Sequence, residues 1–108
     1  MNIQYKKGVI ELCALSLLSK RDMYGYELSE IISKEIDISD GTIYPILRKL
    51  KADGLVKTYL SEDSSGPPRK YYSLTQTGKE EYERDSNDWF DFATKVNRMI
   101  KGEKQWKK

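Results

Sequence analysis

Residues 38–59, ISDGTIYPILRKLKADGLVKTY, decide the fold, because they predict a turn, a helix, a second break and a strand in that order. Ser39 and Asp40 are of the residue types that commonly cap the start of a helix. Four apolar residues then recur at helical spacing and form one inward stripe: Ile43, Ile46, Leu47 and Leu50. The predicted helix covers about residues 42–52, and Gly54 ends it in the left-handed conformation of a C-cap.

Pro45 limits where this helix can begin, because proline has no amide hydrogen and is tolerated only near a helix start. With Thr42 as the N-cap, Pro45 falls in the first turn. A start at Ser39 or Asp40 is the alternative, and it would strain that turn. The outward positions of the helix are Thr42, Pro45, Arg48, Lys49 and Ala52, with Tyr44 at the margin. The helix therefore has a basic outer face, which is either an ordinary solvated surface or a surface for a polyanion.

Two helices are predicted before this stretch, and a hairpin and a long helix after it. Residues 5–19 are apolar around much of the helix, which is typical of a central buried helix, and residues 25–34 form a second one. Strands are predicted at residues 55–61 and 69–74, and a final helix at about residues 77–101. Three helices followed by a two-stranded hairpin predict a mainly α (α+β) fold, the winged helix-turn-helix, with the hairpin as its wing.

The composition excludes several classes of function. The chain has 108 residues, of which 33% are charged, a formal net charge of +2, one cysteine and no histidine. Without histidine, a cysteine pair or a phosphate-binding glycine loop, we expect no metal, no cofactor and no enzymatic activity. Cys13 lies among apolar residues and is expected to be a buried structural thiol. There is no signal pattern and no apolar run near about 20 residues, so we expect a cytoplasmic protein without a membrane segment.

The charge is unevenly distributed along the chain. Residues 21–41 hold two basic and six acidic residues, whereas residues 42–59 hold four basic residues and one acidic residue. A helix is about as wide as the major groove of B-DNA, so residues near its start can reach base edges while free amides approach phosphate. Arg69 and Lys70 flank the tip of the hairpin, where they can reach a neighbouring groove. Together these features predict DNA binding; a winged-helix module that binds protein, or DNA without sequence preference, is the alternative.

The chain also resembles a known family. The resemblance covers about residues 8–82 and rests on four stretches: GVIELCALSLL in the first helix, MYGYEL at residues 23–28, GTIYPILRKLKADGLV at residues 41–56 and GPPRKYYSLTQTGKEE at residues 66–81. These stretches, in this order and spacing, resemble the PadR family of bacterial transcriptional regulators. The single C-terminal helix is similar to the compact branch of that family, which includes multidrug-responsive repressors. The wing tip, SSGPPRK, departs from the family pattern, which often has a further glycine or arginine there.

The resemblance implies a homodimer that binds a palindromic operator near a promoter, usually as a repressor. It also implies which positions face DNA. The positions that match the family's DNA-contacting segments are Tyr24, Thr42, Tyr44, Pro45, Arg48 and Lys49, with Arg69 and Lys70 in the wing. Two of these have a plainer interpretation, because Tyr24 and Tyr44 are also suited to the rim of the core. Thr42 is likewise suited to a purely capping role.

The final helix carries an apolar stripe that one small domain cannot bury alone. The residues of this stripe, the predicted dimer interface, are Tyr82, Trp89, Phe92, Ala93, Val96, Met99 and Ile100. Phe90 widens the stripe, and Asp85 stands where its period predicts an apolar residue. We therefore expect residues 1–75 to form the DNA-binding domain, and residues 76–108 to form a dimerisation helix and a basic tail.

Trp89 has two interpretations. It is an anchor of the dimer interface, or it also lines a pocket between the subunits that accepts a flat aromatic or apolar effector, as the resemblance to the multidrug-responsive branch implies. Its expected neighbours in such a pocket are Tyr5, Phe92 and Val96. A ligand there would change operator affinity only by binding one dimer geometry better than another.

Overall fold

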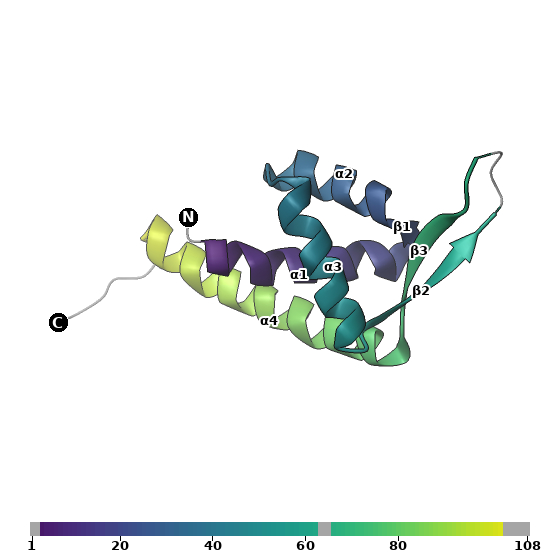
Figure 1. The fold of residues 1–108 in the computed structure, drawn as a ribbon. Coiled ribbons are helices and arrows are strands. Elements are labelled where there is room, and N and C mark those ends of the chain that lie inside the picture. Colours follow the sequence, from purple (N-terminus) through teal and green to yellow (C-terminus); the bar gives the residue numbers. More distant parts are fainter. Residues whose placement is uncertain (1–2, 63–65, 103–108) are drawn as a thin grey trace.

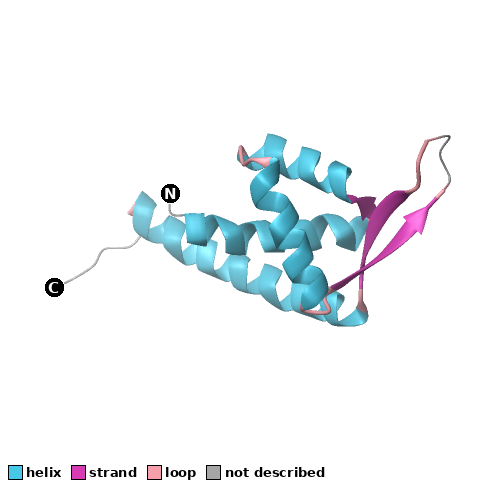
Figure 2. Cartoon of the chain, in the orientation of Figure 1, coloured by secondary structure: helices cyan, strands magenta, loops and turns pink. Residues whose placement is uncertain are grey.

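The structure, a computed structural model, describes residues 3–62 and 66–102 and, for residues 3–7, the backbone alone. Its elements follow one another in the order α1 (Ile3–Lys20), β1 (Met23–Tyr24), α2 (Gly25–Ile36), α3 (Asp40–Ala52), β2 (Val56–Ser61), β3 (Arg69–Leu74) and α4 (Gln76–Lys101) (Figures 1 and 2). This confirms the winged helix-turn-helix arrangement. The predictions for the wing tip at residues 63–65, the basic tail after residue 102 and the Tyr5 side chain lie outside the described residues.

The sheet has three antiparallel strands in the order β1-β3-β2, so the prediction of two strands was incomplete. The missing strand is β1, whose residues Met23 and Tyr24 pair with Tyr72 and Tyr71 of β3. Two residues are too few to show an alternating pattern, and this strand exists only because β3 lies beside it. The wing is therefore joined at its base to the connection between α1 and α2.

The start of α3 differs from the preferred prediction. Ser39 is the N-cap and Thr42 lies inside the helix, so the assignment of Thr42 as N-cap was wrong and the alternative start at Asp40 holds. A contact between helices fixes this start, because the hydroxyl of buried Ser29 on α2 donates a hydrogen bond to the carboxylate of Asp40, at 2.5 Å. Pro45 consequently falls in the second turn of α3.

The end of α3 follows the prediction. Gly54 adopts a φ of +76°, the left-handed region that favours glycine. Its amide donates to the carbonyl of Lys51 at 3.0 Å, while the amide of Asp53 donates to the carbonyl of Lys49 at 2.9 Å. These bonds satisfy carbonyl groups that the last turn of a helix leaves free, and they direct the chain into β2.

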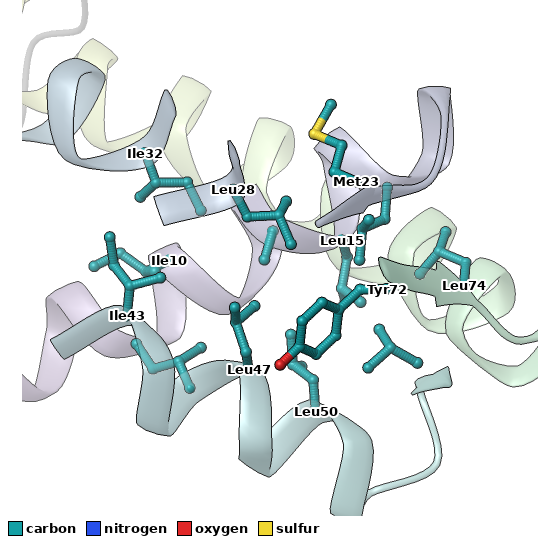
Figure 3. Close-up of a cluster of buried hydrophobic side chains, with 14 residues drawn as sticks. Ile10, Leu15, Met23, Leu28, Ile32, Ile43, Leu47, Leu50, Tyr72 and Leu74 are labelled. Carbon is teal, nitrogen blue, oxygen red and sulfur yellow. The ribbon is translucent and has the colours of Figure 1, made fainter. Parts of the chain in front are cut away.

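The core lies where α1, α2 and α3 meet β3 (Figure 3). The predicted inward stripe of α3 is confirmed, because the side chains of Ile43, Ile46, Leu47 and Leu50 are all buried. Figure 3 shows Leu47 and Leu50 of α3 next to the ring of Tyr72 from β3. Cys13 is half-buried, and desolvation raises the pKa of its thiol. Across residues 3–62 and 66–102, no helix combines the length and apolar character that crossing a bilayer requires.

Candidate nucleic-acid interface

The face of α3 that points away from the core is the first part of the candidate site. Because its apolar stripe is fixed in the core, Pro45, Arg48 and Lys49 are exposed, and Thr42 and Tyr44 are half-buried. This arrangement follows from the helical period alone, since residues three and four apart lie on the same side. The outward positions expected from the sequence are therefore outward in the fold.

A groove of about 650 Å³ lies between α3 and the wing, and we call it the α3–wing groove. Its lining comes from β1, the start of α2, α3 and β3: Tyr24, Gly25, Tyr26, Tyr44, Arg48, Arg69, Lys70 and Tyr72. The fold thus brings Arg48 of α3 to the same groove as Arg69 and Lys70 of the wing. Gly25, Tyr26 and Tyr72 were not among the residues predicted for the site, although Gly25 and Tyr26 stand in the YGYE motif beside Tyr24.

The groove carries free positive charge. Arg48, Arg69 and Lys70 are exposed, and none of them forms an ion pair with a carboxylate of residues 8–62 or 66–102. Glu27, at the start of α2, is instead held by a hydrogen bond from Arg21, which is the main reason its pKa is lowered. Cations that lack a carboxylate partner in a concave site are suited to phosphate oxygens.

Aromatic rings hold one of these cations in place. The guanidinium carbon of Arg69 lies 4.6 Å from the centroid of the Tyr24 ring, a cation–π arrangement. Tyr24 in turn contacts Tyr71 of β3, with ring centroids 5.7 Å apart, and Tyr71 stacks on Tyr59 of β2 at 5.6 Å. We call Tyr24, Tyr71 and Tyr59 the tyrosine row, which crosses all three strands.

The tyrosine row was not predicted, because it depends on the register of the sheet. Tyr71 pairs with Tyr24 on one side and with Tyr59 on the other. The hydroxyl of Tyr59 also donates a hydrogen bond to Asp22, at 2.6 Å, in the connection between α1 and β1. The row therefore braces the base of the wing against the helical part of the fold.

Thr42, Pro45 and Lys49 lie apart from the α3–wing groove. They line a smaller hollow of about 190 Å³ together with Glu11 of α1 and Ile46. The ammonium of Lys49 lies 3.3 Å from the carboxylate of Glu11 and 2.9 Å from that of Asp53. The hydrogen bond to Asp53, followed by the one to Glu11, raises the pKa of Lys49. Two neighbouring basic residues of α3 thus differ: Lys49 is paired, whereas Arg48 forms no ion pair with a carboxylate of residues 8–62 or 66–102.

Three of the four predicted effector residues, Trp89, Phe92 and Val96, lie on α4, and Tyr5 lies on α1. Trp89 and Phe92 have ring centroids 6.5 Å apart and line two hollows. The first, of about 400 Å³, is the α1–α4 groove, and it is lined by Gly8, Val9, Leu12, Asp85, Asp88, Trp89 and Phe92. The second, of about 270 Å³, is lined by Trp89, Phe92, Ala93, Val96 and Asn97. Trp89, Phe92 and Val96 therefore lie together on one surface of α4.

The predicted dimer residues are unequally buried within one chain. Tyr82 is half-buried and packs against the core. Further along α4, the exposed fractions rise to 52% for Phe92, 57% for Met99 and 78% for Ile100. Figure 1 shows that the C-terminal half of α4 extends beyond α3, beside the N-terminal end of α1. The apolar end of α4 is thus uncovered by the rest of the described chain.

Comparison with known proteins identifies the family. A family model described as the Transcriptional regulator PadR-like family matches residues 14–84, which contain every residue that lines the α3–wing groove. The chain belongs to this family.

Solved structures of PadR-like proteins are similar to the whole fold. A PadR-like transcriptional regulator from Bacillus cereus strain ATCC 14579 is 38% identical, over 90% of this chain and 96% of that chain, with a TM-score of 0.82. A PadR family transcription regulator from hypervirulent Clostridium difficile R20291 is 34% identical, over 84% of this chain and 97% of that one, with a TM-score of 0.77.

A curated relative carries a functional name. The Negative transcriptional regulator PadR of Bacillus subtilis strain 168 is 26% identical over 99 residues, which are 88% of this chain and 52% of that protein. The chain therefore spans about half the length of this relative. PadR-like proteins are DNA-binding transcriptional regulators and not enzymes, so family membership confirms that enzymatic activity is not expected here.

Proposed function

We propose that this PadR-like regulator binds double-stranded operator DNA as a homodimer, with α3 in the major groove and the wing beside it, and that it represses transcription. The observation that carries the proposal is the α3–wing groove, in which Arg48, Arg69 and Lys70 converge from α3 and β3 without carboxylate partners in the described chain. A phosphate backbone that passes between a recognition helix and a wing meets these cations together.

The residues take different roles in this proposal. Thr42, Tyr44 and Pro45 lie in the first half of α3, where side chains are best placed to reach base edges. Arg48, Arg69 and Lys70 neutralise phosphates. Tyr24 holds the guanidinium of Arg69, and Lys49 lies at the edge of the same surface.

The homodimer is proposed from α4. Met99 and Ile100 are large apolar side chains that are mostly exposed to solvent in the single chain. A second copy of α4 is the simplest partner that would bury them. Residues 76–108 would then serve dimerisation, and a twofold protein would meet two half-sites about one DNA turn apart. The name of the Bacillus subtilis relative, a negative regulator, supports repression. A regulator of a bacterial operator would act in the cytoplasm.

An effector is proposed for the surface that Trp89, Phe92 and Val96 share, with Tyr5 as a further candidate neighbour. The resemblance to the compact multidrug-responsive branch supports such an effector site. The adjacent rings of Trp89 and Phe92 are also suited to a flat aromatic molecule. Titration with flat aromatic dyes should quench the tryptophan fluorescence, to which Trp89 and Trp106 both contribute, and a Trp89→Phe variant should lose that response. Unchanged Trp89 fluorescence at high micromolar dye would contradict an effector site.

The DNA-binding proposal is tested by fluorescence anisotropy with the duplex upstream of the protein's own gene and with a scrambled duplex. Arg48→Ala, Arg69→Ala and Lys70→Ala should each weaken binding to both duplexes and reduce the salt slope by about one unit, as loss of one phosphate contact requires. Lys34→Ala is the matched control, because Lys34 is exposed on α2 but paired with Glu30 at 2.9 Å. Variants that all bind like the wild type would refute the assigned surface.

A further inference from the structure

Glu11 places a carboxylate at the edge of the surface that faces DNA. It lies on α1, yet it lines the same hollow as Thr42, Pro45 and Lys49 of α3. Figure 1 shows that α3 crosses α1, and the Glu11–Lys49 ion pair joins these two helices. The side chain of Glu11 is 28% exposed and that of Lys49 is 58% exposed, so the pair lies at the surface and not in the core.

Two carboxylates share the charge of Lys49. The carboxylate of Asp53, one turn further along α3, lies 2.9 Å from the ammonium of Lys49. The carboxylate of Glu11, on the neighbouring helix α1, lies 3.3 Å from the same ammonium. Asp53 is the C-cap of α3, where its negative charge is repelled by the negative end of the helix dipole. The positive charge of Lys49 offsets this repulsion. Glu11 has no such constraint. Its pair with Lys49 is a surface ion pair, which contributes little to folding.

We infer that Glu11 is a positioning residue that holds Lys49 back from DNA and so limits the sequence-independent part of DNA binding. This inference rests on the proposed function. A lysine restrained by two carboxylates neutralises a phosphate less well than a free one, because the phosphate must compete with both of them. Arg48, the residue before Lys49, forms no ion pair with a carboxylate of residues 8–62 or 66–102, so it has no restraint of this kind.

The distinguishing feature is dependence on Lys49. If Glu11 served only to pack α1 against α3, its replacement would lower stability and leave the salt dependence of DNA binding unchanged. If it restrains Lys49, its replacement should strengthen binding, and the effect should vanish when Lys49 is absent. A double-mutant cycle separates these two roles.

The experiment uses the full chain as wild type, Glu11→Gln, Lys49→Gln and the double variant, with the upstream duplex and a scrambled duplex over a range of KCl concentrations. Glu11→Gln should bind both duplexes tighter by the same factor, up to about fivefold at low salt, which is the scale of one exposed ion pair. Its salt slope should increase by up to about one unit. The double variant should match Lys49→Gln.

Glu30→Gln is the matched control, because it removes the same charge and breaks a comparable lysine pair on α2, with Lys34. It should leave the slope unchanged. A Glu11→Gln protein with wild-type affinity and slope would overturn the inference, as would an increase that persists in the Lys49→Gln background or one restricted to the upstream duplex. A wild type that binds neither duplex would overturn the proposed function itself, and this inference with it.

Discussion

The α-carbon of Gly78 lies so close to the carbonyl oxygen of Leu55 that a β-carbon at position 78 would be 2.0 Å from that oxygen. Gly78 is buried in the first turn of α4, and Leu55 connects α3 to β2. Thr75 joins the same two segments, since its hydroxyl accepts from the amide of Gly78 at 3.0 Å and donates to the carbonyl of Gly54 at 2.7 Å. The absence of a side chain at position 78 therefore sets where α4 leaves the winged domain.

Gly78→Ala should destabilise the fold by about 2 kcal/mol or more, because the clash is with backbone that cannot rotate away. Urea denaturation followed by circular dichroism measures this change. Gly41→Ala is the control, since its nearest neighbour would be 3.9 Å away and alanine is the better helix former. A Gly78→Ala protein as stable as Gly41→Ala would refute the close approach.

The contact between Tyr24 and Arg69 predicts a difference between two substitutions. Tyr24→Leu removes the ring beneath the guanidinium and should weaken DNA binding about two- to fivefold, since an exposed cation–π contact contributes about 0.5–1 kcal/mol. Tyr24→Phe keeps the ring and should retain most of the affinity. Anisotropy titrations at one salt concentration are sufficient. Equal loss in both variants would instead assign the contribution to the hydroxyl.

Asp85 predicts a pH-dependent stability. Burial, followed by the nearby charge of Glu81, raises the pKa of its carboxyl above the ordinary value. The folded protein then binds more protons than the unfolded chain between the two pKa values, so the stability from this group falls as the pH rises through that window. Asp85→Asn should therefore raise the melting temperature at pH 7, and the gain should shrink as the pH approaches 4.

The control for Asp85 is Asp91→Asn, because Asp91 is exposed and paired with Lys95 at 2.9 Å. Removing its charge should give no gain at pH 7. Thermal melts of the three proteins across this pH range test the assignment. A gain for Asp85→Asn that is independent of pH would mean that the removed cost is steric and not electrostatic.

The exposed end of α4 predicts a separation between folding and association. Ile100→Glu should leave the fold intact, because 78% of that side chain is exposed in the single chain, and it should shift the protein towards monomer. Sedimentation equilibrium gives the association state and circular dichroism the fold. Thr94→Glu is the control, because Thr94 is exposed on another side of the same helix. Unchanged association for Ile100→Glu would place the interface elsewhere.

Local pattern was sufficient for the elements that repeat over several residues. The buried stripe of α3 and the bounds of β3 match the prediction. Apolar residues recur with a period of about 3.6 in a helix and 2 in a strand, so a short run of sequence is enough to recognise them. The prediction from Pro45 placed the start of α3 two residues too late, because the hydrogen bond between Ser29 and Asp40 favours the earlier start. That contact joins residues of two different helices, so no periodic pattern in the sequence predicts it.

By itself, the sequence determined the order of the helices and of the two wing strands, the inward face of α3, the basic character of its outer face and the family, because each of these depends on neighbouring residues or on short motifs. The tertiary structure alone decided that β1 pairs with β3, that the ring of Tyr24 lies beneath the guanidinium of Arg69, and that Lys49, unlike Arg48, forms ion pairs with carboxylates of the described residues. These relationships join residues from separate elements. Their distances are set by packing and strand register, which no local period encodes.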